Sequence, residues 1–195
     1  MHERHGAKQP ERFDPAKAAA LDDPARFAYL PAEALERLLD LPRGGLLVDF
    51  GTGTGTYARA LARLRPDAEI AALDEQPRML ELLRDRLAAE PRPNVRPVLS
   101  DDAGLAPLQG RADRVLALNV LHELGDDALE SLARLLKPGG RALFVDWSAD
   151  VERPVGPPRG HVYGPAQAKE RLGRFGWTVA GEALFDYHYA LVCAR

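Results

Sequence analysis

The chain has 195 residues, of which 46% are hydrophobic, and a formal net charge of −3. This length suits one domain with a substantial core, and the charge excludes the broadly basic surface that nucleic-acid backbones attract. A single cysteine, Cys193, excludes a disulfide framework and a cysteine-built metal site within one chain. We find neither an apolar run long enough to span a membrane nor a secretory signal, so we expect a cytoplasmic protein.

The N-terminal part of the sequence predicts a polar tail followed by helices. His2 and His5 are three residues apart, whereas a helical zinc motif places its histidines four apart, so no metal site is expected there. Leucines spaced as a helical stripe follow between residues 14 and 41, with a break at Tyr29-Leu30-Pro31. We interpret residues 1–41 as a tail and a helical lid that moves over a ligand cleft.

The rest of the sequence alternates short apolar runs with amphipathic runs. Strands are expected at 46–50, 69–73, 95–99, 114–118 and 141–145, and helices at 57–64, 77–89, 128–136 and 165–175. This succession predicts an α/β fold with a doubly wound, Rossmann-like sheet of about seven strands, mostly parallel, and helices on both faces. The last two strands, 177–184 and 187–193, are joined too tightly for a crossover, so we expect an antiparallel terminal hairpin.

A glycine-rich loop follows the first strand. Asp49 lies near the end of that strand, and Gly51, Gly53 and Gly55 alternate with threonines behind it. Glycine permits backbone angles that a side chain would forbid, and the N–H groups at the start of the next helix attract polar or negatively charged ligand groups. The dinucleotide fingerprint requires its last glycine where Thr56 stands. A nicotinamide-dependent oxidoreductase is therefore the weaker alternative.

Five features in order resemble the class I S-adenosylmethionine-dependent methyltransferases, especially the type 11 or ubiquinone-biosynthesis-like branch. They are the D-x-G-x-G-x-G loop, Asp74 after the second strand, Asp102-Ala103 after the third, Asn119-Val120-Leu121-His122-Glu123-Leu124 after the fourth, and the turn Leu136-Lys137-Pro138-Gly139-Gly140. The resemblance is strong over residues 40–150. It implies that residues 42–195 form a methyltransferase domain and that the cofactor is S-adenosyl-L-methionine.

The resemblance also implies which residues hold the cofactor. Asp74 can accept from both ribose hydroxyls and is expected to be exposed in the empty cleft, with Glu75 as the alternative acceptor. Asp102 can accept from the adenine amino group, and the N–H of Ala103 can donate to the ring. Asp49 is expected to hold the glycine loop or to meet the ammonium group. The full set of expected cofactor-binding residues is Asp49, Gly51, Thr52, Gly53, Gly55, Asp74, Glu75, Asp102, Ala103 and Asn119.

Methyl transfer from a sulfonium releases a neutral thioether, so positioning dominates, and a base is needed only when the acceptor must lose a proton. His122 and His161 are the catalytic candidates. The residues expected to contact the acceptor are Tyr29, Asp146, Trp147, Tyr187 and His188. No N-P-P-Y-like tetrad follows the fourth strand, so amino-group methylation of bases in nucleic acid is not expected. With the net charge of −3, we expect a small-molecule acceptor and no nucleic acid. A cofactor-binding regulatory or partner protein without transferase activity remains an alternative.

Overall fold

One mixed sheet organises the computed structural model, which describes residues 13–195, so that His2, His5 and most of the expected tail lie outside the described residues. Its seven strands have the order β3-β2-β1-β4-β5-β7-β6. The strands are β1 (Leu46–Phe50), β2 (Glu69–Asp74), β3 (Val95–Leu99), β4 (Ala112–Leu118), β5 (Leu136–Trp147), β6 (Thr178–Leu184) and β7 (His188–Ala194). β1 to β5 pair in parallel, and β7 pairs antiparallel with both β5 and β6. The predicted sheet and its terminal hairpin are confirmed.

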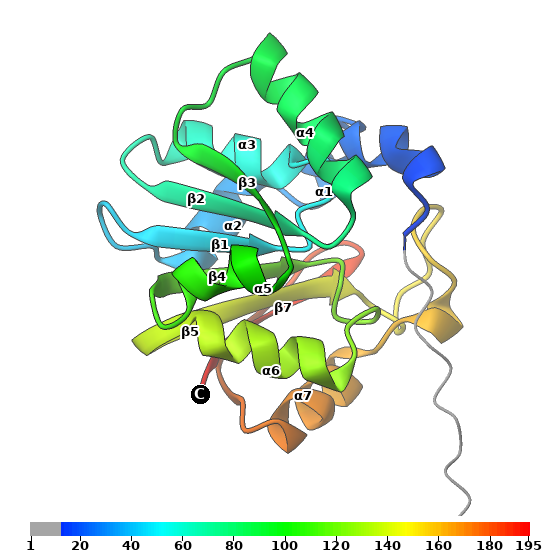
Figure 1. Ribbon diagram of the computed structural model, residues 1–195. Coiled ribbons are helices and arrows are strands. Elements are labelled where there is room, and N and C mark those ends of the chain that lie inside the picture. The colour runs from blue at the N-terminus through cyan, green and yellow to red at the C-terminus, as the bar shows by residue number, and fades with distance from the viewer. Residues whose placement is uncertain (1–12) are drawn as a thin grey trace, which may run out of the picture.

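Helices cover both faces of this sheet. They are η1 (Pro15–Asp22), α1 (Arg26–Tyr29), α2 (Ala32–Leu39), α3 (Thr56–Leu64), α4 (Pro77–Ala89), α5 (Asp102–Leu105), η2 (Ala106–Leu108), α6 (Asp126–Leu135), η3 (Arg159–His161) and α7 (Pro165–Arg174). Leucines of α2, α3 and α4 pack against one face, and those of α6 and α7 against the other. Figure 1 shows α6 in front of the strands and α2 behind them.

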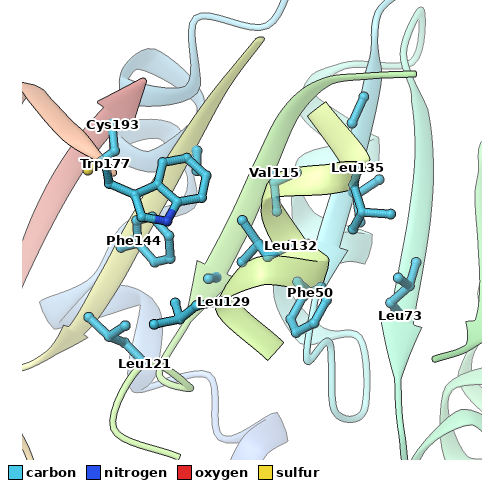
Figure 2. Packing of buried hydrophobic residues seen from close by; sticks show 14 of the residues in the cluster. Phe50, Leu73, Val115, Leu121, Leu129, Leu132, Leu135, Phe144, Trp177 and Cys193 are labelled. Atoms are coloured by element: carbon cyan, nitrogen blue, oxygen red, sulfur yellow. The ribbon is translucent and has the colours of Figure 1, made fainter. Parts of the chain in front are cut away.

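The core under α6 is formed by the regularly spaced apolar residues of the strands and of this helix. Phe50 and Leu73, from β1 and β2, face Leu132 and other leucines of α6 (Figure 2). At the far side of the same cluster the rings of Phe144 and Trp177 meet edge to face, with centroids 5.2 Å apart. Cys193 is buried there, and burial raises the pKa of its thiol to about 12, so the thiol stays protonated at neutral pH.

Two expected elements differ from those observed. β5 begins at Leu136, before the expected turn, because Leu136 already pairs with Ala112 of β4. Gly139 sits inside this strand with a φ of 76°, so the lysine-proline-glycine-glycine run bends the strand rather than preceding it. Residues 15–22 form a 3₁₀ helix in which only Ala18 is buried, since this run has no apolar stripe. No helix in residues 13–195 is long and apolar enough to cross a membrane.

Candidate active site at the carboxyl ends of the strands

The glycine loop joins β1 to α3 at the point where the strand order reverses, which is where ligands bind in doubly wound sheets. Gly51, Gly53 and Gly55 have φ angles of 76°, 56° and 75°, in the left-handed region that favours glycine. A Cβ on Gly51 would lie 2.7 Å from Cγ1 of Val120, and one on Gly55 would collide with Leu83. Geometry and space therefore both require glycine at these two positions.

Two carboxylates hold this loop in shape. Asp74 accepts hydrogen bonds from the backbone N–H groups of Gly53 (2.8 Å) and Gln76 (2.9 Å), one on each oxygen. Asp49 accepts from the hydroxyl of Thr52 at 2.6 Å. Burial raises the pKa of both carboxyl groups, that of Asp49 to about 6, while the hydrogen bonds oppose the shift. These contacts make the two acids part of the loop architecture.

The expectation that Asp74 is exposed in the empty cleft is wrong. Its exposed fraction is 7%, because the loop folds back over the end of β2 and uses the carboxylate as an acceptor. A carboxylate offers about four acceptor positions, so these two bonds leave lone pairs for ribose hydroxyls. Glu75, the alternative acceptor, is exposed directly after β2.

The remaining expected cofactor residues lie at the neighbouring strand ends. Asn119 follows β4 with a φ of 57°, and its side-chain oxygen is buried with no hydrogen-bond partner among the described residues. A buried acceptor of this kind calls for a ligand or water donor. Asp102 and Ala103 are exposed after β3, and the turn there is capped by Asp101, which leaves Asp102 outside that cap. The unpartnered side-chain oxygen of Asn119 and the narrow glycine loop fit S-adenosylmethionine.

His122 and Asp146, expected separately as catalytic and acceptor-contacting residues, form a pair. Asp146 is fully buried at the end of β5, and both its oxygens lie 2.9 Å from Nδ1 of His122. It also accepts from the backbone N–H groups of His122 and Trp147. Burial disfavours the charged ring, but the bonds to Asp146 and then Glu123 raise the pKa of His122 to about 9. His122 is therefore an imidazolium at neutral pH, oriented by Asp146.

Four further rings expected to contact the acceptor come together as an aromatic cluster, made of Tyr29, Trp147, Tyr187 and His188. His188 lies 4.0 Å from Trp147 between ring centroids, and stacks nearly parallel to Tyr29 at 5.7 Å. Tyr29 also contacts the rings of Trp147 and Tyr187. The cluster joins the N-terminal segment to the adjacent ends of β5 and β7.

His188 is the unusual member of the cluster. Its exposed fraction is 1%, and neither ring nitrogen has a hydrogen-bond partner in the described part of the chain. Burial, followed by the charges of Arg26 and Arg153, lowers its pKa to about 3. The ring is neutral and carries one unused donor and one unused acceptor.

The structure does not join His161 to this site. His161 lies exposed on η3, and no contact links it to His122 or to the aromatic cluster within residues 13–195. Its role in catalysis stays a prediction. Sequence reasoning missed Arg153, whose guanidinium lies 5.4 Å from the ring of Trp147. Its only signal was a basic side chain in the proline-rich loop after β5.

The described part of the N-terminal segment crosses the glycine loop. Asp22 accepts hydrogen bonds from the hydroxyls of Thr54 (3.0 Å) and Thr56 (2.8 Å), and pairs with Arg86 of α4. A Cβ on Gly53 would lie 3.0 Å from Cδ1 of Leu21. In Figure 1 this segment and the loop after β5 lie at the same end of the sheet. These contacts place Leu21 and Asp22 against the glycine loop, and the expected lid and its movement stay a proposal.

The switch-point loop and its acids define a Rossmann-like cofactor-binding domain. Residues 47–140 match the family model described as a methyltransferase domain. Residues 47–140 form a class I S-adenosylmethionine-dependent methyltransferase domain, whose cofactor is S-adenosylmethionine. A solved S-adenosylmethionine-dependent methyltransferase from Aquifex aeolicus superposes with a TM-score of 0.86 at 26% identity, covering 93% of this chain and 98% of that one. The expected family and fold are confirmed.

Curated relatives differ in what they act on. Trans-aconitate 2-methyltransferase of Methylobacterium radiotolerans is 38% identical over 127 residues, 64% of this chain and 45% of that protein. The ubiquinone/menaquinone biosynthesis C-methyltransferase UbiE of Syntrophotalea carbinolica is 30% identical over 156 residues, 79% and 63% of the two chains. The tRNA (carboxymethyluridine(34)-5-O)-methyltransferase ALKBH8 of Mus musculus is 27% identical over 123 residues, 60% and 17%. The chain spans less than two thirds of each.

Proposed function

We propose that this protein transfers the methyl group of S-adenosylmethionine to a small-molecule acceptor. The observation that carries the proposal is the glycine loop, whose left-handed glycines are fastened by Asp74 at the switch point of the sheet. The unpartnered oxygen of Asn119 beside it supports a bound ligand with a donor group. Asp49, Asp74, Asp102 and Asn119 would hold the cofactor, and the glycines would let it approach the backbone.

When bound, S-adenosylmethionine supplies an electrophilic methyl group on a sulfonium whose leaving group is neutral. The residues of this chain then have to orient an acceptor and exclude water, and correct alignment alone is worth about 7–11 kcal/mol. The aromatic cluster, placed at the ends of β5 and β7, would form the acceptor wall. His161 would act from the loop after β5 if that loop folds inward.

His122 acts in this proposal as a proton-bearing group. Because its pKa is about 9, it holds a proton at neutral pH and would stabilise negative charge on the acceptor rather than remove a proton. Asp146 is a positioning residue, since its oxygens are occupied by His122 and by backbone N–H groups. Glu123 lies 3.5 Å from Nε2 and competes for the outward side of the ring.

The choice of a small molecule over RNA rests on charge and on the size of the site. The net charge of −3 does not favour a phosphate backbone, and the acceptor wall consists of four rings, of which Trp147 and His188 are buried. Among the relatives, the name of one gives trans-aconitate and that of another ubiquinone/menaquinone biosynthesis. One relative is named as a tRNA methyltransferase, so the experiment must also test RNA as the acceptor.

The test uses the full chain with methyl-labelled S-adenosylmethionine and two fractions of a cell extract, small metabolites and total RNA. We expect labelled product in the metabolite fraction only, and a lower rate for the His122→Asn variant. Label in the RNA fraction alone would contradict the small-molecule acceptor. Tight cofactor binding with no labelled product in either fraction would favour a regulatory protein without transferase activity.

A further inference from the structure

We propose that the acceptor is an organic acid whose carboxylate is bound by Arg153, beside the ring of Trp147. This inference rests on the proposed function and names the class of acceptor for the same site. The hollow concerned, of about 500 Å³, is lined by Glu152, Arg153, Pro154 and Arg159 in the loop that follows β5. We call it the Arg153 hollow.

Arg153 is a cation without a carboxylate partner among residues 13–195. Its two terminal nitrogens donate to the backbone carbonyls of Ser148 (2.8 Å) and Pro157 (2.6 Å). Its Nε is buried and has no hydrogen-bond partner in the described chain. Burial and the charge of Arg159 lower the pKa of Arg153, while Asp146 acts in the opposite direction. The guanidinium is fixed in place, and Nη2, which donates one hydrogen bond, keeps its second N–H for an anion.

A second hollow of the molecule differs from the Arg153 hollow in how its arginines are paired. It measures about 480 Å³ and is lined by residues that include Arg59, Arg86 and Arg92. There Arg59 and Arg92 share Glu90, and Arg86 pairs with Asp22, so each of these guanidiniums has a carboxylate partner within the protein. The Arg153 hollow has two guanidiniums instead, since the one hydrogen bond of Arg159 also goes to a backbone carbonyl. Glu152 is the acid in its lining, and it forms no ion pair with either arginine in residues 13–195.

The ring of Trp147 connects Arg153 to the aromatic cluster. The guanidinium of Arg153 lies 5.4 Å from the ring of Trp147, which in turn contacts His188. His188 is buried, and neither of its ring nitrogens has a hydrogen-bond partner among residues 13–195. A cationic acceptor is disfavoured here, because the positive charges of Arg26 and Arg153 both act on His188 in the cluster.

The test compares probes of equal shape. Benzoate and benzamide differ in charge, and both are titrated into the protein with S-adenosylhomocysteine present, while the indole N–H of Trp147 is followed by NMR. We expect benzoate to bind about tenfold or more tightly than benzamide. Arg153→Gln should remove this preference, and Arg153→Lys should keep part of it. Arg141→Gln, an exposed arginine at the opposite end of β5, is the matched control and should leave it unchanged.

Several outcomes would overturn the inference. Equal affinities for benzoate and benzamide, or a preference for benzoate that survives Arg153→Gln, would show that Arg153 does not bind the carboxylate. Tighter binding of phenyl phosphate than of benzoate would assign the hollow to phosphates. If Arg153→Gln does not fold, the wild-type preference and Arg153→Lys decide. Calorimetry with S-adenosylhomocysteine separates the two claims, because its binding supports the proposed function whatever the acid preference.

Discussion

Nδ1 of His122 lies 2.9 Å from both carboxylate oxygens of the fully buried Asp146. A buried acid beneath a largely buried histidine keeps the ring charged and fixes which nitrogen faces outward. The two residues follow β4 and end β5, neighbours in the sheet, so the fold itself brings them together.

Asp146→Asn should lower the pKa of His122 from about 9 toward or below its ordinary value of 6.5, since the strongest charge partner is lost while burial remains. NMR titration of the imidazole measures this directly. Glu123→Gln is the matched control and should lower the pKa less, because Glu123 lies farther away, at 3.5 Å. A His122 pKa that does not respond to Asp146→Asn would contradict the pairing.

The same pair makes stability depend on pH. The folded-state pKa of His122 is raised, so its stabilising contribution is complete below pH 6.5 and is lost as pH rises through about 9. Urea unfolding of wild type and His122→Asn should therefore show a stability difference that shrinks between these values. A difference that grows with pH over this range would have the wrong sign for an imidazolium paired with a carboxylate.

Gly55→Ala should cost more stability than Gly139→Ala. Both residues have positive φ angles, 75° and 76°, and each loses about 1–2 kcal/mol when a side chain is forced into that region. Only at Gly55 would the new Cβ also collide with Leu83, whereas nothing lies within 4 Å at Gly139. Urea unfolding checks the order, and equal losses would mean that Leu83 moves aside without cost.

Asp74→Ala should weaken cofactor binding by about 1.5–3 kcal/mol, because the charged acceptor for the ribose is lost. It should also lower the free energy of unfolding by about 1–3 kcal/mol for each of the two N–H groups left unpaired, those of Gly53 and Gln76. Calorimetry and urea unfolding measure the two effects. A larger loss of affinity in Glu75→Ala than in Asp74→Ala would assign the ribose to Glu75.

The lid proposal predicts that cofactor binding slows hydrogen exchange in residues 13–41. Asp22→Asn, which weakens the contacts to Thr54, Thr56 and Arg86, should speed exchange of this segment in the free protein. Glu33→Gln in the same segment serves as the control. Equal protection with and without cofactor would show a segment fixed permanently to the sheet.

The sheet, its terminal hairpin and the glycine loop could be predicted from the sequence, because the spacing of apolar residues and the turn residues encode these features locally. It was insufficient where the outcome depended on which side chains meet across the sheet. His122 and Asp146 were both identified, but their pairing depends on the register of β4 and β5. Asp74 was placed at the correct strand end, yet its burial follows from the loop folding back over it.

Arg153 was missed for the same physical reason. Its significance comes from Trp147 beneath it and from the absence of an acidic partner in the described structure, neither of which has a local pattern. The start of β5 was also misplaced. The strand was expected to begin at Arg141, after the turn, but pairing of Leu136 with Ala112 extends β5 through residues that favour a turn. Long-range contacts decided each of these cases.

Calorimetric titration of the full chain with S-adenosylmethionine, S-adenosylhomocysteine and NAD tests the central claim most directly. The glycine loop, Asp74 and Asn119 predict binding of the first two in the micromolar range and no binding of NAD, since Thr56 replaces the glycine that a dinucleotide needs. Tighter binding of NAD than of S-adenosylmethionine would contradict the account.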